Sequence, residues 1–252
     1  VIELKGRPVQ LQGNALARRA LEAAGWTIKF DGLPSRQGVV IVYPHTSNWD
    51  FLIGLATKWS LGFAVHFWGK DSLFKIPLFG RWMRWVGGVP VDRKSPKGLV
   101  EQMVERIRQA RDADEFFWLA IAPEGTRGHA AHWRSGFYRV ALQSKVPLGL
   151  AYFDFDEKVV GLDRFIQLSG NQEADMAVIA GHLAHRRGKK PHLAAPVRLP
   201  PEHKEAQAGA PRHSVCANAC WACSSASSMR SKPKTVRAAS FATNGAKGMA
   251  KD

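Results

Sequence analysis

The chain has 252 residues, of which 45% are hydrophobic and 23% are charged, enough apolar side chains for one sizeable core. Its 36 Lys and Arg against 21 Asp and Glu give a net charge of +15, which favours polyanionic partners such as anionic lipid, phosphate-bearing substrates or nucleic acid. No run approaches the ~18–20 apolar residues that a membrane-spanning helix needs, and the first residues do not resemble a signal peptide.

Hydrophobic periodicity divides the first 190 residues into alternating helices and strands. In chain order it predicts a helix at 15–24, strands at 26–30 and 39–43, a helix at 48–59, strands at 64–69 and 88–92, a helix at 96–111, a strand at 116–122, a helix at 136–144, a strand at 147–153 and a helix at 172–186. The continuous apolar run at 39–43 is typical of a strand that is buried on both faces, as in a parallel sheet. We therefore expect an α/β fold, a single domain with a mostly parallel central sheet flanked by helices.

The character of the sequence changes near residue 191. Pro, Ala, Ser and Lys then dominate and the periodicity disappears, so the segment cannot bury enough apolar surface to offset the entropy of ordering it. The sequence thus predicts a folded domain at 1–190 and a disordered, basic C-terminal tail at 191–252. All three cysteines, Cys216, Cys220 and Cys223, fall in this tail. Their spacing is also that of an iron–sulfur ligand set, but without the large barrel that such a set accompanies we expect no metal site.

The richest polar pattern is Pro44-His45-Thr46-Ser47-Asn48-Trp49-Asp50, directly after the strand at 39–43. In open α/β sheets, ligands collect where strands end and helices begin. Ser47 suits an N-cap, which places Asp50 at the third helical position, where its carboxylate suits the helix dipole. From there Asp50 could also reach an imidazole nitrogen of His45, fix its tautomer and stabilise the imidazolium formed on proton uptake. The alternative is that Asp50 only caps the helix and His45 is an ordinary loop side chain.

Two further polar segments lie at the ends of strands. Pro123-Glu124-Gly125-Thr126-Arg127 follows the strand at 116–122 and offers a carboxylate, close backbone approach and an arginine fork for phosphate, although it would also make an ordinary turn. The segment 70–93 brings basic and aromatic residues to another strand edge. Together the three segments predict a site at one edge of the sheet.

In order and separation over residues 35–155, these segments resemble the glycerolipid (1-acylglycerol-3-phosphate) acyltransferase family. The corresponding motifs are His-x4-Asp at His45 and Asp50, Gly-x4-Arg at Gly88 to Arg93, Pro-Glu-Gly-Thr-Arg at Pro123 to Arg127, and Val-Pro at Val146 and Pro147. The stretch 133–138, Trp-Arg-Ser-Gly-Phe-Tyr, resembles a smaller bacterial branch of the family. One departure is Leu148, where the family usually has a second proline, and it leaves the wall of the acyl pocket and the identity of the acceptor open.

The resemblance implies an O-acyltransferase of phospholipid biosynthesis, with a glycerol-3-phosphate acyltransferase-like α/β domain at 1–190. His45 would deprotonate a hydroxyl of a lysophospholipid such as 1-acylglycerol-3-phosphate, and Asp50 would orient the imidazole. The oxygen would attack the thioester of acyl-CoA or of an acyl-carrier protein, without a covalent acyl-enzyme. The donor is a substrate, so the resemblance implies no cofactor and no metal. The residues that would bind the phosphate and glycerol of the acceptor are Arg93, Glu124, Gly125, Thr126 and Arg127.

Residues 59–85 interleave aromatic with basic side chains, a composition typical of surfaces that lie at headgroup depth. Most of these rings are expected to pack in the core, as aromatic rings usually do. Trp82 and Trp85, beside Arg81 and Arg84, are the best candidates for membrane contact. We therefore expect a peripheral or monotopic protein on the cytoplasmic face of an anionic membrane, with no transmembrane helix.

Two other functions remain open. A nucleic-acid-binding protein would explain the net charge and the basic segments 186–190 and 230–237, but none of the four ordered motifs, so we expect no nucleic acid partner. An ester hydrolase could use His45 with water as the acceptor, but the chain has no Gly-x-Ser-x-Gly elbow. His182 and His185 have no evident acidic partner, and we expect them to be surface or packing residues.

Overall fold

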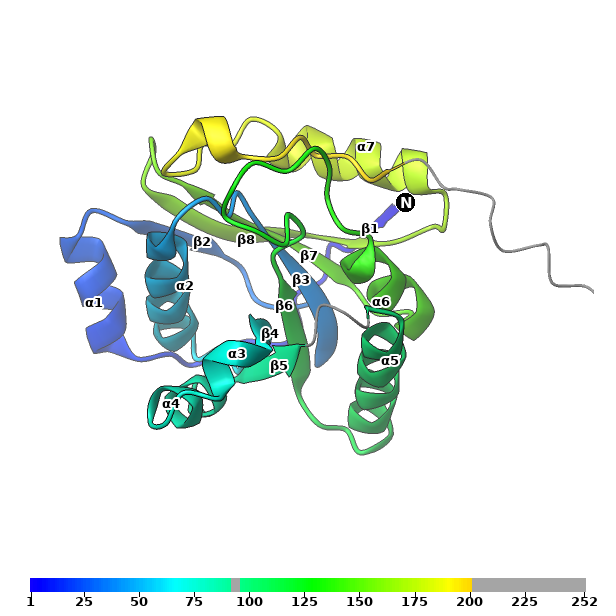
Figure 1. Ribbon diagram of the computed structural model, residues 1–252, viewed down its shortest axis with the longest axis horizontal. Coiled ribbons are helices and arrows are strands. Elements are labelled where there is room, and N and C mark those ends of the chain that lie inside the picture. The colour runs from blue at the N-terminus through cyan, green and yellow to red at the C-terminus, as the bar shows by residue number, and fades with distance from the viewer. Residues whose placement is uncertain (92–95, 201–252) are drawn as a thin grey trace, which may run out of the picture. The chain divides into compact units, whose positions relative to one another are not determined.

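Strands from most of the chain join in one sheet, in the order β1-β8-β7-β3-β6-β4-β5, with β2 paired to β8 (Figure 1). The computed structural model describes residues 1–91 and 96–200. Its strands are β1 (Ile2–Glu3), β2 (Thr27–Phe30), β3 (Gln37–Tyr43), β4 (Val65–Lys70), β5 (Gly88–Val91), β6 (Phe117–Ile121), β7 (Leu148–Asp154) and β8 (Val159–Gln167). Its helices are α1 (Ala15–Ala23), α2 (Asn48–Leu61), α3 (Asp71–Phe74), α4 (Phe79–Trp85), α5 (Pro96–Asp112), α6 (Gly136–Ser144), α7 (Gln172–Leu183) and the 3₁₀ helix η1 (Pro191–Leu193).

The centre of the sheet is parallel, as predicted. β3 pairs in parallel with β6 and β7, and β4 pairs in parallel with β5 and β6. The exception is β8, which returns antiparallel to β7 after a tight turn and also pairs antiparallel with β1. β8 was not predicted from the sequence because Asp163 and Arg164 interrupt its apolar run. The short elements β1, α3 and α4 were not predicted because they show no periodicity.

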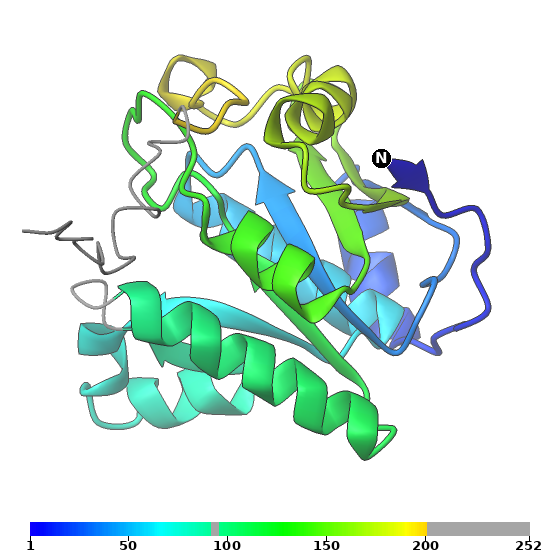
Figure 2. The same cartoon turned by 90° about the vertical axis from the view of Figure 1, so that its right-hand side faces the viewer.

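Alternate residues of β3 face two different cores, which is why this strand is apolar throughout. Val39 and Ile41 pack with buried side chains of α5, α6 and α7. Val40 faces the other way, into a cluster with Leu61 at the end of α2. Figures 1 and 2 show α5 and α6 side by side on one face of the sheet, with α1 and α2 on the other face. The domain is therefore the expected α/β arrangement, with helices on both faces of the sheet.

The folded part extends beyond residue 190, so the predicted domain boundary is too early. Ala195 is fully buried and Leu199 nearly so, both in the core that contains β3. The main chain of this irregular segment bonds to distant loops: the carbonyl of Arg198 accepts from the amide of Trp133, and the amide of Ala195 donates to Glu124. Such pairing leaves no periodic signal. Residues 201–252, including Cys216, Cys220 and Cys223, lie outside the described residues.

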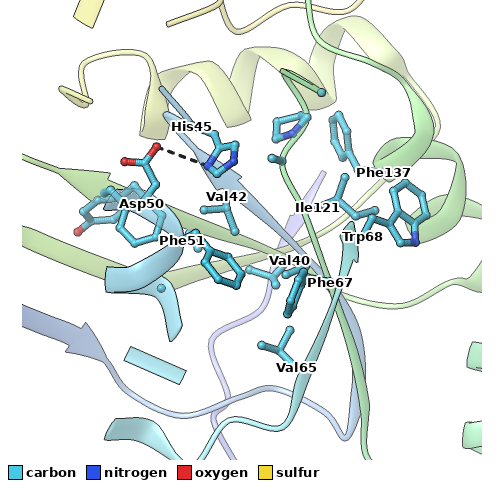
Figure 3. A pocket seen from close by; sticks show the side chains of 18 of the residues that line it. Val40, Val42, His45, Asp50, Phe51, Val65, Phe67, Trp68, Ile121 and Phe137 are labelled. Carbon is cyan, nitrogen blue, oxygen red and sulfur yellow. Dashed lines mark ion pairs between the residues drawn. The ribbon is translucent and has the colours of Figure 1, made fainter. Parts of the chain in front are cut away.

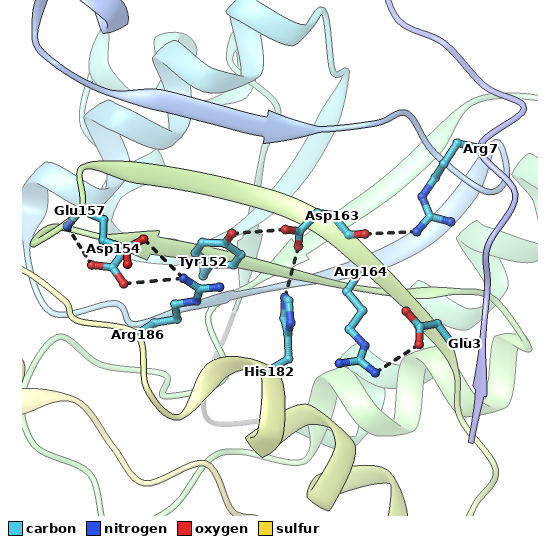
Figure 4. Close-up of polar contacts among 9 residues, drawn as sticks. All are labelled: Glu3, Arg7, Tyr152, Asp154, Glu157, Asp163, Arg164, His182 and Arg186. Carbon is cyan, nitrogen blue, oxygen red and sulfur yellow. Dashed lines mark hydrogen bonds and ion pairs between the residues drawn. The ribbon is translucent and has the colours of Figure 1, made fainter.

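Polar contacts attach α7 to β7 and β8 (Figure 4). Nε2 of His182 lies 3.2 Å from Oδ1 of Asp163, and the hydroxyl of Tyr152 donates to Oδ2 of the same carboxylate. The guanidinium of Arg186 lies over the Tyr152 ring, 3.8 Å from its centroid. The expectation that His182 lacks an acidic partner is therefore wrong, because its partner Asp163 lies on β8, a strand that was not predicted. We interpret these contacts as structural.

No helix among residues 1–91 and 96–200 combines the length and the apolar composition needed to cross a membrane.

Candidate active site

The parallel strands deliver three polar segments to one edge of the sheet. His45 follows the end of β3, Glu124 follows the end of β6, and Lys70 is the last residue of β4. Because β3, β6 and β4 run in the same direction, their carboxyl ends meet at this edge. This is the edge at which α/β folds bind ligands.

The imidazole of His45 faces the carboxylate of Asp50, as Figure 3 shows. Nδ1 of His45 lies 3.5 Å from Oδ2 of Asp50; the Asp50 side chain is buried and His45 is half-buried. The same Oδ2 accepts a 2.7 Å hydrogen bond from the amide of Ser47, and Ser47 caps α2 in return, which completes a capping box. Asp50 thus both caps α2 and faces the imidazole, so the two interpretations of its role are compatible.

This geometry determines which nitrogen of His45 can act as a base. A carboxylate beside Nδ1 favours the tautomer with the proton on that nitrogen, which leaves Nε2 unprotonated. Burial, together with the positive charge of Arg127, lowers the pKa of His45 to about 4. Burial raises the pKa of Asp50, and hydrogen bonds from the amides of Ser47 and Thr46 oppose that shift. His45 is therefore neutral at pH 7, the form that can accept a proton.

Glu124 holds three segments of the chain together from a buried position. Its Oε2 accepts a 2.5 Å hydrogen bond from the amide of His45, and its Oε1 accepts one of 2.9 Å from the amide of Ala195. The hydroxyl of Tyr43 donates to the carbonyl of Ala195, which ties the same segment to the end of β3. Burial raises the pKa of Glu124 to about 7, although both amide bonds lower it. The predicted substrate-binding residue Glu124 thus directs both oxygens to main-chain amides.

The rest of the loop after β6 lies nearer to solvent. Gly125 has φ 67°, and a Cβ there would lie 2.5 Å from Nε of Arg134, so the position requires glycine. Oγ1 of Thr126 accepts a hydrogen bond from the amide of Gly128. Thr126, Arg127 and Arg134 all line the cavity described next, and Arg127 and Arg134 are exposed. Arg134 was not predicted as a site residue, although it lies in the stretch 133–138 that resembles the bacterial branch.

A mainly apolar cavity of about 850 Å³ lies beneath these polar residues. His45 and Asp50 line it together with buried side chains from β3, and Figure 3 shows Val42 and Val40 below the imidazole. Its volume is within the range of about 300–1,000 Å³ that is usual for ligand sites. The apolar lining from α2 and from β3 and β4 includes Val40, Val42, Phe51, Leu55, Val65 and Phe67.

This lining was not predicted from the sequence. The only sequence signal for the lining is that α2 and β4 are unusually rich in apolar side chains, which is equally typical of core packing. Which of these side chains border the cavity and which fill the core depends on how α2 packs against the sheet. That relationship is tertiary, so no local pattern in the sequence carries it.

One predicted motif lies away from the site, and part of another falls outside the described residues. Val146 and Pro147 precede β7, and Pro147 accepts a hydrogen bond from the amide of Val39 near the start of β3, at the opposite end of the strands from His45. Neither residue lines the cavity, and neither does Leu148, so the departure from the usual motif does not alter the cavity wall. Arg93 lies outside the described residues; β5 ends at Val91. No group of three His, Cys, Asp or Glu side chains in the described part of the chain is arranged to hold a metal ion.

Comparisons with known proteins point to one family. Residues 27–149 match the family described as Acyltransferase. A 1-acyl-sn-glycerol-3-phosphate acyltransferase of Limnanthes douglasii is 26% identical over 144 residues, 55% of this chain and 49% of that protein. One from Streptococcus pneumoniae is 28% identical over 118 residues, 46% of this chain and 42% of that protein. The chain spans about half or less of the length of these curated relatives.

Among solved structures, the 1-acyl-sn-glycerophosphate acyltransferase of Thermotoga maritima aligns with a TM-score of 0.45 at 18% identity. The alignment covers 69% of this chain and 78% of that one. The region that matches the family, 27–149, contains the His45–Asp50 pair and the whole loop from Pro123 to Arg127. The chain therefore contains a region, residues 27–149, that matches the acyltransferase family.

Proposed function

We propose that the protein transfers a fatty acyl group from an acyl thioester, either acyl-CoA or an acyl-carrier protein, to a hydroxyl of a lysophospholipid such as 1-acylglycerol-3-phosphate. The observation that carries this proposal is a neutral imidazole, paired with a buried carboxylate, at the polar end of a large apolar cavity. The curated relatives that match the chain are named 1-acyl-sn-glycerol-3-phosphate acyltransferases, which supports a glycerolipid acceptor.

In the proposed reaction, Nε2 of His45 takes the proton from the acceptor hydroxyl. The oxygen forms a bond to the thioester carbonyl carbon, the carbon–sulfur bond breaks, and the imidazolium returns its proton to the leaving thiolate. Ester and free thiol are the products, and no acyl-enzyme forms. Asp50 orients the ring and stabilises the imidazolium while it exists, a type of assistance that contributes about 10²–10⁴-fold to rate.

Charge and shape divide the site between the two ends of a lipid. Arg127 and Arg134 are exposed cations at the polar end, where a bidentate guanidinium suits a phosphate monoester. The apolar lining below His45 suits a fatty acyl chain, because each methylene withdrawn from water is stabilised by about 0.8 kcal/mol. Glu124, with both oxygens engaged, would act by holding the His45 loop rather than by touching the acceptor. A lipid acceptor also implies peripheral association with a membrane surface.

The test is to incubate the purified protein with radiolabelled acyl-CoA, or acyl-carrier protein, and a panel of lysophospholipids, and to resolve the lipid products. We expect labelled phospholipid that depends on the acceptor. Release of labelled fatty acid alone, at the same rate without acceptor, would show a hydrolase instead. Absence of both products with every donor and acceptor would reject the proposal.

Variants connect the activity to the site. His45→Ala should lower kcat by at least about 10²-fold while the thermal midpoint stays close to that of the wild type. The matched control is His129→Ala, since His129 is exposed in the same loop region but does not line the cavity. Full activity in His45→Ala would exclude His45 as the base.

A further inference from the structure

Exposed apolar side chains concentrate on one part of the molecule. In the described part of the chain, eight of the eleven large hydrophobic side chains that are exposed belong to α2, α3, α4 or the connection between α3 and α4. The largest exposed fractions among these eight are 78% at Leu78 and 73% at Trp85. The Trp85 ring lies beside that of Trp59 from α2, with 6.3 Å between centroids. We call this surface the α4 face; it comprises Trp59, Leu73, Ile76, Leu78, Phe79 and Trp85.

Leu78 has an unusual backbone conformation for a leucine. Its φ of 61° and ψ of −53° lie where side chains with a Cβ are strained. Burial of the side chain does not offset this strain, because Leu78 is the most exposed large hydrophobic residue described. Strained backbone positions cluster at active sites, ligand clamps and switch regions, so the strain at Leu78 suggests a functional role for this position.

The charge around the α4 face identifies the partner. Between residues 62 and 90 the chain has Lys70, Lys75, Arg81 and Arg84, and Asp71 is the one acidic residue. Lys75 pairs with Asp71 at 2.7 Å, whereas the side chains of Lys70 and Arg81 are exposed. A second copy of this chain would bring the same positive charge against the face. An anionic lipid surface matches both the charge and the apolar side chains.

The α4 face is continuous with the cavity. Phe67 and Phe51 line the cavity, and their rings are 5.5 Å apart. Phe51 also contacts Trp82, and Trp82 contacts Phe79 on the face, with centroids 6.1 Å and 5.5 Å apart. Leu73 belongs to both the face and the cavity lining. A row of contacting aromatic rings therefore connects the exposed surface with the lining of the cavity below His45.

We propose that the α4 face docks on an anionic bilayer and that a lysophospholipid enters the cavity directly from the membrane, along the rings of Phe79, Trp82 and Phe51. The proposal rests on the proposed function for the nature of the acceptor, but not for the docking itself. It refines the expectation from the sequence: Trp85 is exposed as a membrane anchor would be, whereas Trp82 is half-buried and belongs to the entry path.

Docking is tested by co-sedimentation of the full chain with vesicles of phosphatidylcholine alone or mixed with phosphatidylglycerol. The wild type should prefer the anionic vesicles, and 0.5 M salt should weaken its binding. Ile76→Ser and Trp85→Ser should each bind about tenfold more weakly. Ile2→Ser is the matched control, because Ile2 is equally an exposed isoleucine but lies on β1 at the far edge of the sheet. Equal binding of all three variants would overturn the proposal.

Leu78→Gly separates docking from structure. Glycine adopts φ 61° without strain, so the thermal midpoint should stay the same or rise, while vesicle binding falls. A lower midpoint with unchanged vesicle binding would show that Leu78 supports the fold and does not dock. Gel filtration with light scattering tests whether a second copy of the chain covers the α4 face instead. If Trp85→Ser converts a dimer to a monomer and binds vesicles normally, the face is a dimer interface and the proposal fails.

Acyl-transfer assays with two kinds of acceptor distinguish a failure of the docking proposal from a failure of the proposed function. The docking variants should lose acyl transfer to a lysolipid embedded in vesicles but keep it with a short-chain lysolipid that is soluble as a monomer. Equal loss on both acceptors would contradict the entry path. If the wild type acylates neither acceptor, the proposed function fails, and the vesicle-binding comparison still decides whether the α4 face docks.

Discussion

The main-chain amide of His45 donates a 2.5 Å hydrogen bond to Oε2 of Glu124, 79 residues later in the chain. The proposed base is thus positioned through its backbone by a buried carboxylate, while Asp50 faces its ring. Two carboxylates act on one histidine in different ways. The first two predictions separate their roles.

Glu124→Gln should destabilise the protein. The glutamate accepts from the amides of His45 and Ala195, but a glutamine offers only one acceptor, so its amide group must face one of these N–H donors. Leaving a buried N–H unpaired costs about 1–3 kcal/mol. Urea unfolding should show this loss, and kcat should fall as the His45 loop shifts. Glu101→Gln, at an exposed position on α5, is the control. Equal stability of both variants would refute the claim that the hydrogen bonds of Glu124 hold these segments together.

Asp50→Asn should preserve the helix cap and impair catalysis. The asparagine oxygen can still accept from the amide of Ser47, but a neutral amide cannot stabilise the imidazolium of His45. We expect kcat to fall about 10²–10⁴-fold with little change in the thermal midpoint. If kcat stays at the wild-type value, Asp50 is only a capping residue, the alternative that its sequence position allows.

Arg127→Ala should weaken the binding of phosphorylated acceptors. We expect a higher KM for 1-acylglycerol-3-phosphate and no comparable change for a monoacylglycerol, which lacks the phosphate. Arg36→Ala is the control, since Arg36 is an exposed arginine at the opposite end of the parallel strands. Kinetics with both acceptors make the comparison, and an unchanged KM for the phosphorylated one would exclude the phosphate role.

The free energy of unfolding should depend on pH through the protonation of His45. Its folded pKa of about 4 lies below the ordinary value of 6.5, so the unfolded chain binds more protons between these two values. The contribution of His45 to stability is therefore present above pH 6.5 and lost as the pH falls towards 4. Chemical unfolding from pH 7 to pH 4 should show a steeper loss in the wild type than in His45→Ala. Parallel curves would mean that the pKa of His45 is not depressed.

The predictions from sequence succeeded where the signals are local. The apolar run of β3, the N-cap at Ser47 and the periodicity of α5 correctly placed the central sheet, the start of α2 and the helical layer. Sequence spacing also brought His45 and Asp50 together, because His45 lies two residues before the Ser47 N-cap and Asp50 is the third residue of α2. In each case a few neighbouring residues determine the structure.

The failures involve partners that lie far apart in the chain. Asp163 interrupts the apolar pattern of β8, and its partner His182 comes from α7. The role of Glu124 depends on Ala195, and an alanine carries no signal for an amide that donates to a buried carboxylate. The boundary near residue 191 was misplaced for the same reason. Hydrogen bonds between such irregular segments leave no trace in hydrophobic periodicity.

The contact between Glu124 and Ala195 also bears on how the protein can be cut for laboratory work. An expression fragment trimmed to the family match at 27–149 would contain every motif residue of the site that the structure describes, yet it would remove Ala195 and the whole of β8. Glu124 would then lose the amide of Ala195 as a hydrogen-bond donor. Only Leu148 and Gly149 of β7 would remain, so most of β3 would become an exposed edge of the sheet. Fragments intended for assay should therefore continue to residue 200 or beyond.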